Sequence, residues 1–147
     1  VENAIHESYL KKLGLTNEEL AAAKPSIVTD SYTNYMISVA QKEGLPEIMA
    51  AVLACSWTYK LIGDHLEQIP GAKDDPFYGD WVRQYMGKEY REANDLMIDM
   101  YDRFSEGFSE ERLAYLEQIV HVCSQYEYMF WDMAWNGKMT EEGWERA

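Results

Sequence analysis

Apolar residues recur along this chain at intervals of three or four positions, which is the spacing of helices that each bury one face. No segment shows the alternation of apolar and polar residues that is typical of a strand. The four prolines and most of the nine glycines fall where helices are expected to begin or end. With no internal repeat or low-complexity segment, the pattern predicts a single all-α domain, a helical bundle, over residues 1–147.

Capping residues and helix breakers set the predicted boundaries. Thr16 followed by Glu19 forms a capping-box motif. Pro46 suits a first helical position, and Asp75 directly before Pro76 suits the start of a long helix. The predicted helices cover residues 1–13, 17–24, 29–43, 46–67, 76–104 and 110–135, and the last is expected to stop at Asn136–Gly137.

The first candidate for chemistry is Cys55, in the middle of the predicted helix 46–67. At 100° per residue, its apolar neighbours within roughly 60° are Ile48, Ala51, Val52, Tyr59, Ile62 and Leu66. The opposite side of this helix is apolar as well, which predicts a place in the middle of the bundle. A free cysteine on such a face behaves as a small hydrophobic residue or as a nucleophile, and this helix alone favours the first.

Glu127 favours the second interpretation, a nucleophilic Cys55, because it places a carboxylate in the middle of the most apolar face of the last helix. The members of that face within roughly 60° are Leu113, Leu116, Val120, Cys123, Phe130, Trp131 and Ala134. Burying an unpaired carboxylate costs several kcal/mol, so a structural core rarely contains one without a partner. Glu127 is therefore a candidate acid/base, the alternative being a structural carboxyl bonded to a tyrosine or to backbone.

Tyrosines add to this pair. Tyr32 shares a helix face with Tyr35 and Met36, and Tyr85 shares one with Trp81. Tyr59 follows Cys55 by one turn and faces the same way. Each tyrosine alone is typical of a core or rim position. Together with a thiol and a buried carboxyl, they would form a pocket suited to a flat, nitrogen-rich ring.

The net charge of the chain argues against some classes of binding partner. The chain has 13 Lys and Arg against 26 Asp and Glu, a formal net charge of −13. This charge disfavours nucleic acid and anionic membranes as partners, and it is compatible with a small neutral or cationic ligand. The uninterrupted apolar runs are too short to span a bilayer, and we expect no signal peptide at the start of the chain.

The two cysteines, Cys55 and Cys123, lie far apart without metal-binding spacing, which predicts neither a disulfide framework nor a zinc site and fits a reducing, cytoplasmic compartment. Two Glu–His pairs, Glu2 with His6 and Glu117 with His121, lack the Glu-x-x-His spacing of di-iron bundles. No metal and no cofactor are predicted.

Four segments carry a resemblance to a known family: SYTNYM at residues 31–36, LACSWTYKLIGDHL at 53–66, DPFYGDWVRQYMG at 75–87 and SQYEYMFWDMAW at 124–135. With them, the chain resembles the TenA family, also called thiaminase II or aminopyrimidine aminohydrolase. The resemblance implies a haem-oxygenase-like all-α fold, a homo-oligomer (tetramer or dimer), and a cytoplasmic hydrolase of thiamin salvage. Such an enzyme converts 4-amino-5-aminomethyl-2-methylpyrimidine to the 5-hydroxymethyl product, and it also cleaves thiamin.

Residue by residue, the resemblance implies that Cys55 is the nucleophile that adds to the pyrimidine ring, as in the Cys-containing branch of the family. It also implies that Glu127 is the acid/base. The residues that it assigns to substrate binding are Tyr32, Tyr59, Tyr85 and Phe130.

Members of the family carry further helices before the point that aligns with Val1, including an aspartate that binds the pyrimidine. The chain is expected to cover the C-terminal two-thirds of the family domain. Two alternatives to a hydrolase are a non-catalytic pyrimidine-binding remnant of the family and a haem-oxygenase-like metal oxidase.

Overall fold

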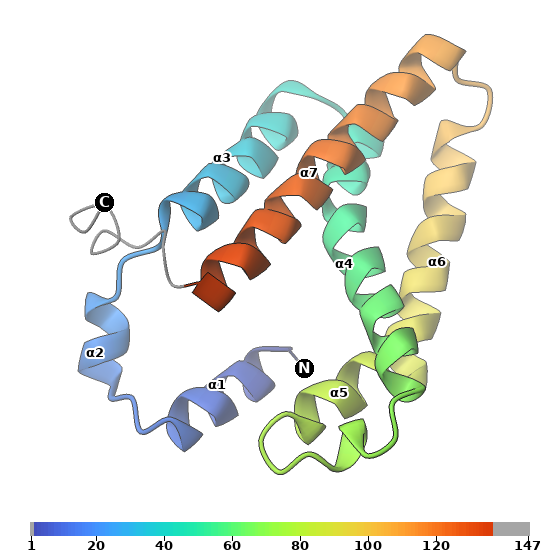
Figure 1. Ribbon diagram of the computed structural model, residues 1–147. Coiled ribbons are helices and arrows are strands. Elements are labelled where there is room, and N and C mark those ends of the chain that lie inside the picture. The colour runs from blue at the N-terminus through green and yellow to red at the C-terminus, as the bar shows by residue number, and fades with distance from the viewer. Residues whose placement is uncertain (1, 137–147) are drawn as a thin grey trace.

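Every regular element in the described part of the chain is helical, as the apolar spacing predicts. The structure, a computed structural model, describes residues 2–136, with side chains from Ile5 onward (Figure 1). The elements are α1 (Glu2–Lys12), α2 (Asn17–Ala22), α3 (Ile27–Lys42), α4 (Leu45–Glu67), the 3-10 helix η1 (Ala72–Asp74), α5 (Gly79–Tyr85), α6 (Lys88–Ser105) and α7 (Glu110–Asn136). The predicted stop of the last helix falls at the end of this range, and Gly137 lies outside it.

Helix α4 is the centre of the bundle and packs against α3, α5, α6 and α7 (Figure 1). Its contact with α7 is the most extensive in the molecule. The buried residues at the core are Val39, Ala50, Ala51, Ala54, Leu116, Ile119 and Cys123. Three alanines on α4 leave little side-chain bulk between the helices, so α4 and α7 can approach closely. The prediction that this helix occupies the middle of the bundle is confirmed.

By length and composition alone, α4 is also apolar enough to cross a bilayer. The sequence predicts no bilayer-spanning segment because each uninterrupted apolar run is too short. The whole of α4 is longer than any of these runs. A core helix meets the same criteria, and α4 is in contact with four neighbouring helices.

The capping residues of α2 act as predicted, whereas the cap of α3 places its start earlier than predicted. At α2, the Thr16 hydroxyl accepts a hydrogen bond from the Glu19 N–H (3.2 Å), and the Glu19 carboxylate accepts one from the Thr16 N–H (2.8 Å). At α3, the hydroxyl of Ser26 accepts from the N–H of Thr29 (3.1 Å), so the helix begins at Ile27 rather than Thr29.

The predicted helix 76–104 is wrong, because the chain forms two helices there. The Asp75 carboxylate accepts from the N–H groups of Phe77 (2.9 Å) and Tyr78 (2.7 Å), but these belong to a turn, and α5 begins only at Gly79. The end of α5 then lies directly on α4: a Cβ added at Gly63 would be 2.3 Å from the Tyr85 carbonyl oxygen. The chain turns away after this contact, and Gly87 precedes the first residue of α6.

Helices α1 and α2 form an arm that leads away from α3 and returns to the opposite end of the molecule (Figure 1). There α1 lies beside α5, and the two are joined by Tyr9 and Lys12. The Tyr9 ring packs on Phe77 with 5.1 Å between centroids. The arm therefore reaches the same helix that contacts Gly63 of α4.

Candidate active site

A polar group lies between α3, α4 and α7, inside otherwise apolar surroundings. It consists of Tyr32, Cys55, Cys123 and Glu127 and is called the polar group below. Glu127 is 5% exposed and Cys123 is fully buried. The Tyr32 hydroxyl is also buried, without a hydrogen bond of normal geometry. Burial raises the pKa of this hydroxyl far above its ordinary value, and the nearby Glu127 carboxylate, Cys123 and Cys55 raise it further.

The helical repeat explains how this group assembles. Cys123 and Glu127 are four residues apart on α7 and therefore face the same way. Tyr32 on α3 approaches from one side, and its ring stacks on that of Tyr126 with 5.3 Å between centroids. The predicted burial of Glu127 is confirmed. The structure thus brings Tyr32, Cys55 and Glu127, three of the predicted site residues, to one place.

The two cysteines differ in access. Burial and the charge of Glu127 raise the pKa of Cys123 to about 11, so this thiol stays protonated at neutral pH. Cys55 is only half-buried. Val52, which shares its predicted face, is exposed, because the core side of α4 is centred on Ala50 and Ala54 instead. Cys55 therefore lies at the edge of the core rather than at its centre.

An aromatic cluster continues from the polar group and is called the aromatic wall below. It consists of Tyr59 of α4, Trp81 and Tyr85 of α5, and Trp131 of α7. The centroid of the Tyr59 ring lies 5.1 Å from the ring centroid of Tyr85, 6.1 Å from that of Trp81 and 6.0 Å from that of Trp131. Trp81 and Tyr85 are 4.5 Å apart. Such a wall offers flat apolar faces to a planar ring.

The polar group and the aromatic wall share the same two helices. Tyr59 follows Cys55 by one turn of α4, and Trp131 follows Glu127 by one turn of α7. The wall is open on one side, since Trp131 is 42% exposed. Phe130 is half-buried and meets Trp131 edge-on, with 6.3 Å between centroids. Of the predicted substrate-binding residues, Tyr59 and Tyr85 are in the wall and Phe130 adjoins it.

Neither Trp81 nor Trp131 is among the site residues predicted from the sequence, although the spacing of each from a predicted site residue was a signal. Trp81 precedes Tyr85 by four positions, and Trp131 follows Glu127 by four, so each lies on the face of a predicted site residue. Their mutual contact, edge-on at 6.3 Å, joins residues 50 positions apart (131 − 81) and has no local signature.

Two cavities lie elsewhere on the described part of the chain. The first, about 420 Å³, is lined from α3 and α7 by Ile27, Val28, Ser31, Val122, Gln125, Tyr126 and Met129. The second, about 500 Å³, shares Gln125 and Met129 with it. Neither is lined by Cys55 or Glu127. The chemistry of the side chains, rather than cavity volume, therefore identifies the candidate site.

Within residues 2–136, no group of three or more His, Cys, Asp or Glu side chains lies close enough to hold a metal ion. The side chain of Glu2, from one of the Glu–His pairs in the sequence, is outside the described side chains. The site contains no candidate ligand set.

Comparison with known proteins gives one consistent picture. The sequence profile of the TENA/THI-4/PQQC family matches residues 1–137. The chain is 45% identical over 139 residues to an aminopyrimidine aminohydrolase of Halalkalibacterium halodurans, an alignment that covers 95% of this chain. It is 38% identical over 134 residues to one of Helicobacter pylori, with 91% of this chain covered. The chain spans 62% of the length of each relative.

A solved structure shows the same fold. The TenA homologue protein from P. horikoshii OT3 superposes with a TM-score of 0.80 at 29% identity. The superposition covers 92% of this chain and 62% of that one. The helical fold expected from the four sequence segments is thereby confirmed.

Proposed function

The chain belongs to the TENA/THI-4/PQQC family, as the four segments predict, and we propose that it carries the reacting groups of an aminopyrimidine aminohydrolase. The proposed reaction replaces the 5-aminomethyl group of 4-amino-5-aminomethyl-2-methylpyrimidine by a 5-hydroxymethyl group. Thiamin, which carries a thiazole at the same carbon, would be cleaved in the same way. The observation that carries this proposal is the juxtaposition of Cys55 and Glu127 at the buried Tyr32 hydroxyl.

Two side chains supply the first proposed step. The Glu127 carboxylate takes the proton of the Cys55 thiol and passes it to a ring nitrogen while sulfur bonds to a ring carbon. The ring now carries more electron density, which expels the protonated aminomethyl nitrogen from the methylene carbon as neutral ammonia. For thiamin, the neutral thiazole would leave instead.

Water completes the reaction. A water molecule adds to the methylene carbon and releases one proton, which the departed ammonia takes up as ammonium, and the carbon–sulfur bond then breaks as sulfur recovers its own proton from the ring. The net change is one water consumed and one amine released, with Cys55 and Glu127 regenerated. No redox step and no further reactant are needed.

Tyr32 supports this proton transfer. Because its pKa is raised far above its ordinary value, the hydroxyl stays protonated across the working range of pH. It can therefore donate toward Glu127 and hold that carboxylate in place without competing for the proton. The aromatic wall is assigned to the ring of the substrate, through the faces of Tyr59 and the exposed Trp131, while the buried Tyr85 packs against Tyr59 and supports it.

We further propose a homo-oligomer in the cytoplasm. Large apolar side chains are exposed along α7, including Tyr128 at 73% and Trp135 at 91%, and contact with a second copy would cover such groups. The two free cysteines, Cys55 and Cys123, fit a reducing compartment.

The test is hydrolysis of the aminopyrimidine by the purified full chain, with product measured by chromatography and ammonia by a coupled assay. Cys55→Ser should abolish product, and Glu127→Gln should lower kcat by about 100-fold or more, because it cannot relay a proton. Ser56→Ala is the matched control: its hydroxyl bonds only to the Leu53 carbonyl and the Met97 sulfur, so activity should persist.

Three outcomes are decisive. Full activity in Cys55→Ser would refute the nucleophile assignment. Ligand-dependent melting of the wild type without product would indicate a pyrimidine-binding remnant instead. Stoichiometric iron in the purified chain, with no hydrolysis, would favour the metal oxidase.

A further inference from the structure

The first turn of α5 has no side-chain cap from the residue just before it. The N-terminal N–H groups of a helix have no partner inside it, and the residue before α5, Tyr78, provides no side-chain hydrogen bond. The Asp75 carboxylate serves only the N–H groups of Phe77 and Tyr78, which precede the helix. The backbone N–H of Trp81 is therefore left to find an acceptor elsewhere.

Tyr9 of α1 supplies that acceptor from a distant part of the chain. Its hydroxyl accepts the hydrogen bond from the Trp81 N–H (3.3 Å) and donates its own proton to the Phe77 carbonyl (2.8 Å). One hydroxyl thus satisfies a donor inside α5 and an acceptor just before it. This is a helix cap provided by a residue 72 positions away.

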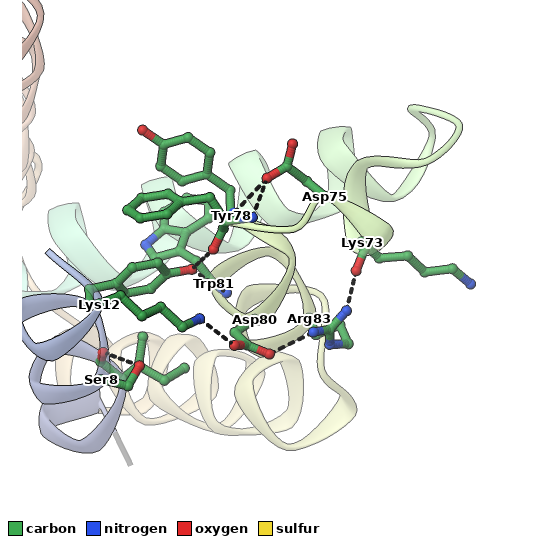
Figure 2. A network of polar contacts seen from close by, with 11 residues as sticks. Ser8, Lys12, Lys73, Asp75, Tyr78, Asp80, Trp81 and Arg83 are labelled. Carbon is green, nitrogen blue, oxygen red and sulfur yellow. Dashed lines mark hydrogen bonds and ion pairs between the residues drawn. The ribbon is translucent and has the colours of Figure 1, made fainter.

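The surrounding contacts keep Tyr9 in place. Its ring packs on Phe77, and the Lys12 ammonium lies 4.9 Å from the ring centroid. Lys12 also pairs with Asp80 of α5 (3.0 Å), and Asp80 pairs with Arg83 (2.6 Å), which bonds to the Lys73 carbonyl (Figure 2). The pKa of Asp80 is lowered by Lys12 first and by Arg83 second, as expected for an acceptor of both.

Helix α5 needs such support because it is short. Its seven residues are well below the length at which an isolated helix is stable in water. Yet it carries Trp81 and Tyr85, two of the four rings of the aromatic wall. Any rotation of α5 would therefore change the faces that the wall offers to a planar ligand.

We propose that Tyr9 is a positioning residue for the aromatic wall: its hydroxyl fixes the first turn of α5 and so sets the places of Trp81 and Tyr85. This inference rests on the proposed function for its consequence in catalysis. Tyr9 is outside the polar group and has no part in the bond-making steps. Its removal should therefore weaken substrate binding more than it slows the reaction.

The variant is Tyr9→Phe, which keeps the ring on Phe77 and removes only the two hydrogen bonds. Hydrogen exchange of the amides in residues 79–85 should become about five-fold faster, and KM for the aminopyrimidine should rise about five-fold, the effect of one net hydrogen bond. The value of kcat should change by less than about two-fold, because Cys55 and Glu127 are untouched. Tyr78→Phe is the matched control, since this tyrosine is 61% exposed and in the same segment.

The readouts separate a failed inference from a failed function. Unchanged exchange in residues 79–85 of Tyr9→Phe would overturn the inference whatever the activity. An unchanged KM in an active enzyme would also overturn it, as would equal effects of Tyr9→Phe and Tyr78→Phe. If the wild type makes no product, the proposed function fails and exchange alone decides: faster exchange confined to α5 supports the positioning role.

Discussion

Gly63 offers a sharp test of how the candidate site is assembled. It lies inside α4, where glycine ordinarily costs about 1 kcal/mol of stability relative to alanine. On helix propensity alone, Gly63→Ala should therefore stabilise the protein by about that amount. The structure predicts the opposite sign.

The reason is the contact with α5. An alanine Cβ at position 63 would be 2.3 Å from the carbonyl oxygen and 2.6 Å from the carbonyl carbon of Tyr85, and 3.2 Å from the backbone nitrogen of Met86. These are backbone atoms, so no side-chain rotation relieves the overlap, and the end of α5 must move. Overpacking of this kind costs about 3 kcal/mol, which leaves a net destabilisation of about 2 kcal/mol after the propensity gain.

The movement should also reach the aromatic wall. Tyr85 is 2% exposed and packs against Tyr59, Trp81 and Tyr90, so a shift of its backbone displaces its ring from all three. Substrate binding should weaken, seen as a higher KM, while the polar group keeps its geometry. The two measurements are therefore a urea denaturation midpoint and the KM for the aminopyrimidine.

A matched control measures helix propensity in this protein. Ala93 is exposed on α6, and Ala93→Gly should cost only about 1 kcal/mol with KM unchanged. A Gly63→Ala variant that is as stable as the wild type, or more stable, would refute the close approach of α4 and α5.

Two further predictions concern the polar group. The thiol of Cys123 has its pKa raised from 9.0 to about 11, so it loses its proton more readily in the unfolded chain, and its contribution to stability is complete below pH 9 and lost as pH rises to 11. Melting temperature should therefore fall more steeply from pH 9 to pH 11 in the wild type than in Cys123→Ala, and parallel curves would contradict this. Tyr32→Phe removes the buried hydroxyl that holds the Glu127 carboxylate, so the free energy of unfolding should fall by about 1 kcal/mol and kcat should fall as well. Reduced stability with unchanged kcat would show that Tyr32 is a structural residue only.

The helices and their buried faces could be predicted from the sequence because both are local properties. Apolar spacing places a residue on a helix face without reference to the rest of the chain, and this suffices for the burial of Glu127. The capping box of Thr16 and Glu19 likewise involves neighbours only. Cys55 and Glu127 lie on different helices, so the two apolar faces can suggest a shared pocket, and their roles as a pair come from the family resemblance.

Tertiary contacts decided the rest. Gly87, directly before α6, is a local signal of the break between α5 and α6, but the contact of the Tyr85 backbone with Gly63, 22 positions away (85 − 63), has no local signature. Trp81 and Trp131 enter the site only because three helices converge there, and Tyr9 caps a helix that begins 70 positions later (79 − 9). The helical repeat fixes which way a side chain points on its own helix. Which residues it meets depends on how distant helices pack, and that packing is decided by the whole fold.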